Sequence, residues 1–312
     1  MSTRESLHDR PIGFVGLGDM GGPIAYRIAA AGFPLAVWSR GVHSLTELSG
    51  QPYVAMNSLR ELGRQCQVVA ICVFGDADVR DVVLGADGLV AAMSPHSVLL
   101  IHSTVSVALC CEIAAAGASR GVHVLDAPVS GARAGAVNGT LTIMVGGDPS
   151  VRGRVTPLLE SYGQVIQWMG PVGSGQKMKV LNNVLGFANG ELANIAIETG
   201  VALGLDPDSV VAVLESGSAG SFALDSLVHN LIPDPVFTAH ATTMIAKDTW
   251  LFQELCRGDE LAPTVLEQLA VERITHPVPD VSLAIDQPAG AATRAEHTSF
   301  PPDMGSDHQK GR

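Results

Sequence analysis

Lysine is scarce in this chain, and its positions indicate where acid–base chemistry could occur. The 312 residues include 31 acidic and 19 basic side chains, and only four of the basic ones are lysines. An arginine guanidinium does not deprotonate in proteins, whereas a lysine ammonium can release a proton and take it back. Scarcity alone assigns no function, so the surroundings of each lysine matter. The four are Lys177, Lys179, Lys247 and Lys310.

Lys179 lies in a glycine-rich segment that is expected to open a long helix. On such a helix Lys179 and Asn183 stand four residues apart on one face, and Gly186 and Gly190 continue that face without bulk. Burying a lysine and an asparagine is costly unless a polar partner meets them. We therefore expect this face to meet a ligand, and we expect Lys177, on another face, to be solvated.

A glycine motif near the N-terminus has the spacing of a dinucleotide-binding loop. It follows the expected strand Ile12–Val15 and opens an expected helix. In a GxGxxG loop the first glycine makes a tight turn, the second admits a pyrophosphate, and the third lets helix and strand pack closely. Packing alone can also produce such turns. The candidate cofactor residues here are Gly16, Leu17, Gly18, Asp19, Met20 and Gly21.

The end of the second expected strand indicates which dinucleotide binds. An NAD site usually has an acid there for the ribose 2′-hydroxyl. Here Ser39 and Arg40 follow the strand, and the next acid is Glu47. A guanidinium and a hydroxyl would hold a 2′-phosphate that a carboxylate would repel. The sequence therefore favours NADP(H) over NAD(H), unless Arg40 merely points into solvent.

Later strand ends should line the same crevice, because ligands bind at the carboxyl edge of a doubly wound sheet. Val73, Phe74 and Thr104 lie at such ends and are candidate cofactor contacts. A structural role for Thr104 is equally open, since Ser103, Thr104 or Ser106 could cap the helix that follows.

Ser130, Gly131 and Ala132 follow an expected strand ending at Asp126, and more glycines come after them. Many glycines after a strand indicate backbone N–H groups turned toward an anion such as a carboxylate. Ordinary turns explain them equally well when this segment is considered alone.

The chain pattern predicts an α/β Rossmann-type doubly wound sheet followed by an all-helical C-terminal domain. In the first half, β-branched runs alternate with helical segments, as in the βαβ units of a parallel sheet. After Ser174 the strands stop, and the proline-free stretch 176–203 is long enough to join two domains. The expected strands span residues 12–15, 35–38, 68–73, 98–102, 122–126, 141–145 and 165–168.

Composition excludes several classes of protein. A net charge of −12 without a basic run lacks the electrostatic footprint of nucleic-acid binding. Apolar stretches are strand-sized, so no membrane segment is expected, and the polar start without a signal-peptide core predicts a cytoplasmic protein. Five cysteines without a CxxC pair predict reduced thiols and no metal site.

Five motifs make the chain resemble the β-hydroxyacid dehydrogenase family over residues 11–265. Its members include 3-hydroxyisobutyrate dehydrogenases, tartronate semialdehyde reductases and glyoxylate/succinic semialdehyde reductases. They have a Rossmann domain, a long interdomain helix and a helical domain that often dimerises. The motifs are Gly16 to Gly21, Asp126 to Gly131, Gly139 to Leu141, the glycine-rich segment ending at Asn183, and Lys247-Asp248.

This resemblance implies an NADP(H)-dependent oxidoreductase that interconverts a small 3-hydroxy acid and its semialdehyde or keto acid. Lys179 would be the general acid–base, protonating the alkoxide that hydride transfer creates. Lys247 would lie near cofactor and substrate, where its charge is a candidate for lowering the pKa of Lys179. The other residues implied to bind the carboxylate-bearing substrate are Ser130, Gly131, Ala132 and Asn183.

The chain pattern, the proline-rich composition after His276 and the resemblance together indicate how the chain divides. We expect a flexible N-terminus (1–10), an NAD(P)-binding domain (11–172), a helical substrate and dimerisation domain (173–275) and a disordered tail (276–312), in a homodimer or homotetramer. Two features depart from the family pattern. Ala132 stands where a glycine is usual, and the glycine- and aspartate-rich start of the family's closing helix is not found after Val271.

Two alternatives remain. An imine reductase shares the architecture but typically has another residue at the position of Lys179. A catalytically silent dinucleotide-binding or assembly module would not need Lys179 and Asn183.

Overall fold

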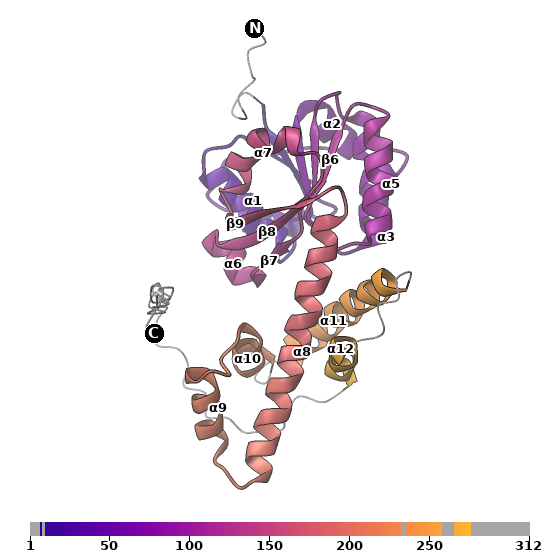
Figure 1. Cartoon of the computed structure of the whole chain (residues 1–312). Coiled ribbons are helices and arrows are strands. Elements are labelled where there is room, and N and C mark those ends of the chain that lie inside the picture. Colours follow the sequence, from indigo (N-terminus) through magenta and orange to yellow (C-terminus); the bar gives the residue numbers. More distant parts are fainter. Residues whose placement is uncertain (1–6, 8–9, 232–234, 258–264, 276–312) are drawn as a thin grey trace, which may run out of the picture.

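The computed structural model describes residues 7, 10–231, 235–257 and 265–275, and its first half is built on one sheet (Figure 1). The sheet has nine strands in the order β3-β2-β1-β4-β5-β6-β8-β7, with β9 paired to β8. The first six are mutually parallel. They are β1 (Ile12–Val15), β2 (Leu35–Trp38), β3 (Val54–Ala55), β4 (Val68–Ile71), β5 (Val98–Ile101) and β6 (His123–Asp126).

The last three strands make the sheet mixed, whereas the sequence pattern predicted only parallel strands from βαβ units. They are β7 (Val129–Ser130), β8 (Leu141–Gly146) and β9 (Gly163–Gly170). Strand β8 runs antiparallel to β6 and β7 and parallel to β9. The sequence did not predict β3 and β7, because two residues are too few to show a hydrophobic period.

Helices cover both faces of the sheet, which confirms the doubly wound fold. Successive strand residues point to opposite faces. In β4, Val68 and Ala70 therefore pack with α1 and α7, whereas Val69 and Ile71 pack with α2 to α5. The helical elements of this half are α1 (Gly21–Ala30), η1 (Val42–Leu48), α2 (Leu59–Gln65), α3 (Asp76–Leu84), α4 (Leu89–Ala92), α5 (Val107–Ala118), α6 (Ala132–Asn138), η2 (Pro149–Val151) and α7 (Arg152–Leu159).

The described residues of the second half form helices joined by short turns, with no strand among them. Helix α8 (Ser174–Ala202) has 29 residues and leaves the edge of the sheet as a rod of about 44 Å (Figure 1). Separate apolar clusters hold the other helices against it, α11 and α12 through one and α9 and α10 through the other. These elements are α9 (Pro207–Ser216), α10 (Phe222–Ser226), the π-helical turn Leu227–Leu231, α11 (Pro235–Cys256) and α12 (Val265–Thr275).

Within the described part of the chain, none of the helices has both the length and the apolar character needed to cross a membrane. The expected tail 276–312 and most of the expected flexible N-terminus, residues 1–6 and 8–9, lie outside the described residues.

The start of α8 is held by a carboxylate from the sheet. Asp126, at the end of β6, is fully buried. Its Oδ1 accepts a hydrogen bond of 2.7 Å from the Gly173 N–H, and its Oδ2 accepts one of 2.8 Å from the Gln176 N–H. Burial raises the pKa of Asp126, and these backbone donors oppose that rise. A side chain 47 residues away from Gly173 thus caps the helix and sets its direction.

Glycine is required where the sheet and α8 meet. A Cβ on Gly146 or on Gly175 would collide with the Asp126 carboxylate or the Met144 carbonyl. Gly173 itself has φ +91°, which side chains rarely adopt. The glycines that the sequence shows on both sides of this joint therefore allow a close approach of backbone to carboxylate.

Asp126→Asn should weaken this joint. The amide would keep the shape but present an NH₂ group to one of the two backbone donors, leaving that donor unpaired. We expect the free energy of unfolding, measured with denaturant, to fall by about 2 kcal/mol. The control is Asp148→Asn, because Asp148 makes an exposed local cap with Ser150. Equal losses in the two variants would contradict the importance of the buried cap.

Candidate active site

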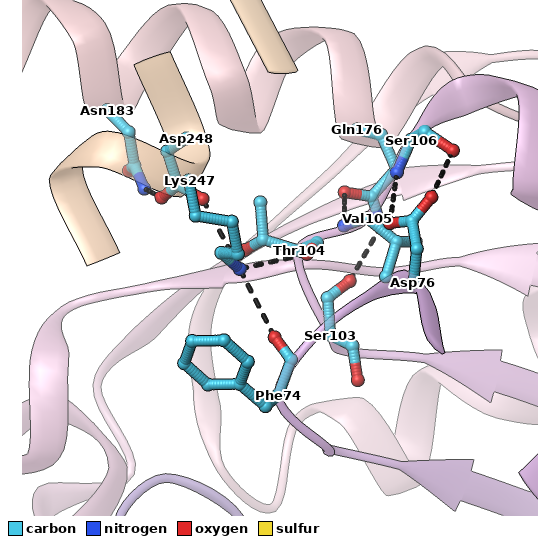
Figure 2. Close-up of polar contacts among 10 residues, drawn as sticks. All are labelled: Phe74, Asp76, Ser103, Thr104, Val105, Ser106, Gln176, Asn183, Lys247 and Asp248. Atoms are coloured by element: carbon cyan, nitrogen blue, oxygen red, sulfur yellow. Dashed lines mark hydrogen bonds and ion pairs between the residues drawn. The ribbon is translucent and has the colours of Figure 1, made fainter. Parts of the chain in front are cut away.

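The carboxyl ends of β4 and β5 are joined by side chains into one platform (Figure 2). The Val73 N–H donates to Ser103 Oγ at 2.8 Å. The Ser106 N–H donates to Asp76 Oδ1 at 3.0 Å. Ser106 also caps the N-terminus of α5. Of the three candidates for this cap, Ser103, Thr104 and Ser106, the structure therefore selects Ser106.

Helix α8 reaches this platform through Gln176, which is fully buried (Figure 2). Its Oε1 accepts from the Val105 N–H at 3.1 Å, and its Nε2 donates to the Ser103 carbonyl at 2.8 Å. The same residue donates its backbone N–H to Asp126. Gln176 therefore fixes both the rotation and the height of α8 over the strand ends.

Lys179 follows on α8 and is partly buried, whereas Lys177 is exposed as expected. Burial lowers the pKa of Lys179 to about 8. The carboxylate of Asp248 opposes this decrease, while the charge of Lys247 adds to it. A lysine with this pKa can exchange a proton near neutral pH.

Lys247 comes from α11 and spans the gap to the Rossmann domain (Figure 2). Its Nζ donates to the Thr104 carbonyl at 3.0 Å and to the Phe74 carbonyl at 3.3 Å, and it lies 5.4 Å from the centroid of the Phe74 ring. The Phe74 side chain is half exposed. Lys247 thus contacts Phe74 and Thr104, two other residues expected near the cofactor.

A polar chain links α11 to the segment after β6. Asn183 Nδ2 donates to Asp248 Oδ2 at 2.6 Å, and its Oδ1 accepts from Asn182 Nδ2 at 3.3 Å. Asn182 Nδ2 is also 3.3 Å from Ser130 Oγ. The expected substrate residues Asn183 and Ser130 are therefore brought together, with Asn182 between them.

The segment from Ser130 to Ala132 has unusual backbone geometry. Gly131 has φ +131°, and Ala132 has φ +51°, in the left-handed region that disfavours a side chain. Ala132 is exposed and begins α6. The alanine that departs from the family pattern is thus strained as well as bulkier than glycine.

The glycine loop has the shape needed for a dinucleotide. A Cβ on Gly16 would strike the Cys72 carbonyl, and one on Gly21 would strike the Gly16 carbonyl, whereas Gly18 has no atom within 4 Å of its Cβ position. The loop is therefore tight at both ends and open at Gly18, where a pyrophosphate would approach the N-terminus of α1. Leu17 is buried, so only its backbone can face a ligand.

Asp19 of this loop has a partner that the sequence did not indicate. Arg133 on α6 donates to the Asp19 carbonyl at 3.0 Å and pairs with the carboxylates of Asp19 and Glu47 at 3.3 and 3.0 Å. Its guanidinium thus ties the Ser130 to Ala132 segment to the glycine loop.

The expected 2′-phosphate residues lie apart from this cluster, at the end of β2. Arg40 is largely exposed but pairs with Asp78 of α3 at 2.8 Å, so it does not simply point into solvent. Ser39 Oγ donates to the Gly41 carbonyl at 3.0 Å. An incoming phosphate would compete with Asp78 for the guanidinium.

The sequence interpretation missed three residues of the site: Gln176, Asn182 and Asp248. Asp248 was noted only as part of a motif, and its almost complete burial shows only in the structure. Asp248 can be identified from the structure because it is a buried polar side chain next to the candidate catalytic residues.

Two families of known proteins match the chain in succession. Residues 11–170 match the NAD binding domain of 6-phosphogluconate dehydrogenase, and residues 173–276 match the NAD-binding domain of NADP-dependent 3-hydroxyisobutyrate dehydrogenase. These matches cover both halves of the fold.

Individual relatives agree with these matches. The chain is 35% identical over 262 residues to an NAD-dependent L-serine dehydrogenase of Pseudomonas aeruginosa, covering 80% of this chain and 86% of the relative. It is 35% identical over 215 residues to a 3-hydroxyisobutyrate dehydrogenase of that species, covering 69% of this chain and 72% of the relative. The solved structure of Mycobacterium tuberculosis 3-hydroxyisobutyrate dehydrogenase with L-serine aligns with this structure at a TM-score of 0.72 and 27% sequence identity. The alignment covers 85% of this chain and 93% of that one.

Ala132→Gly should relieve backbone strain beside the candidate substrate site. We expect the free energy of unfolding to rise by about 1 kcal/mol, because glycine adopts positive φ without a steric penalty. Ala134→Gly, in the same helix and also exposed, should instead lower it by roughly 0.5–1 kcal/mol. Denaturant titration measures both values, and destabilisation by Ala132→Gly would show that the strain is absent.

Proposed function

Since the chain belongs to the 3-hydroxyisobutyrate dehydrogenase-like family of β-hydroxyacid dehydrogenases, we propose that it interconverts a small 3-hydroxy acid and its semialdehyde or keto acid. The chain is an NAD(P)-dependent dehydrogenase acting on CH–OH groups. The proposal adds the substrate class, a preference for NADP(H) and Lys179 as the general acid–base.

One arrangement carries the proposal: the partly buried Lys179 lies on α8 one turn before Asn183, which is held by Asp248, and burial lowers the pKa of Lys179 to about 8. At neutral pH most of this lysine is protonated, so it can donate to a developing alkoxide. Because its pKa lies close to neutral, it can also accept the proton in the reverse direction.

Each group has a distinct task in this reaction. A nicotinamide cofactor bound at the glycine loop supplies or accepts the hydride. In carbonyl reduction, Lys179 Nζ gives a proton to the carbonyl oxygen and becomes a neutral amine. Ser130 and the backbone of Gly131 bind the substrate carboxylate, and Asn183 orients the reacting oxygen. Lys247 joins α11 to the Rossmann domain through its contacts with Phe74 and Thr104, two residues that would contact the cofactor.

Other expectations from the sequence stay proposals. These are the domain limits at residues 172 and 275, the cytoplasmic location, and assembly into a homodimer or homotetramer. Apolar side chains along α8 support assembly, because their exposure favours covering by another subunit. They are Leu181, Leu185, Leu192 and Ile195.

Lys179→Ala should lower kcat for carbonyl reduction by about 10²- to 10⁴-fold, the usual contribution of a general acid. NADPH oxidation, followed by absorbance with succinic semialdehyde, glyoxylate, tartronate semialdehyde or a cyclic imine, measures this loss. In the wild type, reduction should decline above pH 8, because Lys179 then loses its proton, and alcohol oxidation should decline below pH 8.

The matched control is Lys177→Ala, which removes an exposed lysine two residues away. It should leave kcat unchanged. Undiminished turnover in Lys179→Ala would remove the proposed role of this residue. Turnover of the imine but of no carbonyl acid would instead favour an imine reductase.

Arg40→Ala tests the preference for NADP(H). Loss of a charge-assisted contact with the 2′-phosphate should raise the Kd for NADPH by roughly tenfold and leave the Kd for NADH unchanged. Arg60→Ala is the control, because Arg60 makes a similar exposed ion pair with Asp87. If Arg40→Ala raised the Kd for NADPH and the Kd for NADH by the same factor, the proposed contact with the 2′-phosphate would be contradicted. Fluorescence titration of each cofactor distinguishes the outcomes.

A further inference from the structure

Asp248 lies between Asn183 of α8 and Lys247 of α11 (Figure 2). It is 1% exposed. Its Oδ2 accepts from Asn183 Nδ2 at 2.6 Å, and its Oδ1 lies 3.4 Å from Lys247 Nζ. The two carboxylate oxygens therefore face different partners, one an amide expected to orient substrate and the other a cation at the domain boundary.

Structural stability does not account for this arrangement. Among the described residues, Asp248 Oδ1 has no hydrogen bond, and it meets Lys247 only at ion-pair distance. An incompletely satisfied buried carboxylate is costly, and an apolar residue would fill the same space without that cost. A buried polar atom of this kind calls for a functional explanation.

Asp248 also acts on Lys179. Three titratable groups face this lysine: Asp248 and Lys247 from α11, and Cys72 from the end of β4. The thiol of Cys72 has its own pKa raised to about 12 by burial, so it is neutral at physiological pH. Asp248 is thus the negative charge that opposes the effects of burial and of Lys247 on Lys179.

We propose that Asp248 is a positioning residue of the reaction, whose Oδ2 fixes the Asn183 amide and whose carboxylate is the counter-charge to the ammonium groups of Lys247 and Lys179. This role rests on the function proposed above. Without Asp248, the ammonium groups of Lys179 and Lys247 would repel each other with no carboxylate to offset the repulsion. The motif Lys247-Asp248 would then have two tasks. Lys247 contacts the Rossmann domain, and the carboxylate of Asp248 offsets the effect of Lys247 on the pKa of Lys179.

Two substitutions separate the two tasks of Asp248. Asp248→Asn removes the charge but keeps an oxygen that can accept from Asn183. The decline of kcat/KM for carbonyl reduction with rising pH should therefore move toward acid by about one pH unit, with little change in KM for the substrate. Asp248→Ala should show the same pH shift and, because Asn183 is released, a KM raised by about tenfold.

A readout without turnover keeps this inference distinct from the proposed function. The side-chain NMR resonance of Lys179, titrated in Asp248→Asn without substrate, should show the same acid shift of about one unit. Asp87→Asn, which removes an exposed carboxylate that pairs with Arg60, should shift neither the resonance nor the pH profile.

An unchanged Lys179 titration in a folded Asp248→Asn variant would overturn the inference, even if activity falls. If wild-type protein turns over no carbonyl acid, the proposed function fails, and a shifted resonance would still support the electrostatic role of Asp248. Thermal unfolding of each variant shows that the native fold is kept.

Discussion

The buried carboxylate of Asp126 is the contact on which the arrangement of the site depends. It accepts backbone hydrogen bonds from Gly173 and Gln176, so the first turn of α8 is fixed against the end of β6. A helix fixed at its first turn also fixes the side chains that follow at helical spacing. Lys179 and Asn183 consequently face the edge of the sheet where the glycine loop also opens, and the helical half contributes its chemistry at that edge.

Burial and a few charges together set the protonation of Lys179. Burial lowers the pKa of Lys179, and Lys247 lowers it further, while Asp248 opposes both. Lys247 and Asp248 are held by contacts with different elements, so the pKa of Lys179 depends on how the helical half is placed against the sheet. Lys247 is tied to the Phe74 and Thr104 carbonyls, and Asp248 to Asn183. A shift of α11 relative to the sheet would therefore change the protonation of Lys179 as well as the shape of the crevice.

The sequence predicted the fold class, the family and the enzyme class, and all three are confirmed. Those predictions depended on local patterns: apolar strand runs, a glycine loop after a strand, and ordered motifs. The two-residue strands β3 and β7 show no such pattern, and the antiparallel pairing of β8 is set by tertiary contacts. Asp126 and Gly173 are 47 residues apart, so their hydrogen bond has no local signature. The sequence also could not show that Asp248 is buried, that Arg40 meets Asp78, or that Ala132 has positive φ.

The central claim is that α8 holds Lys179 as a proton donor tuned close to neutral pH. The chain has only four lysines, so in protein labelled with ¹³C at the lysine side chain each resonance can be assigned by single substitution. Titrating these resonances measures the claim directly. The account predicts that the Lys179 resonance titrates with a pKa of about 8, lowered from the ordinary value of a lysine. A Lys179 resonance that titrates at the ordinary pKa of lysine, near 10.4, would contradict it.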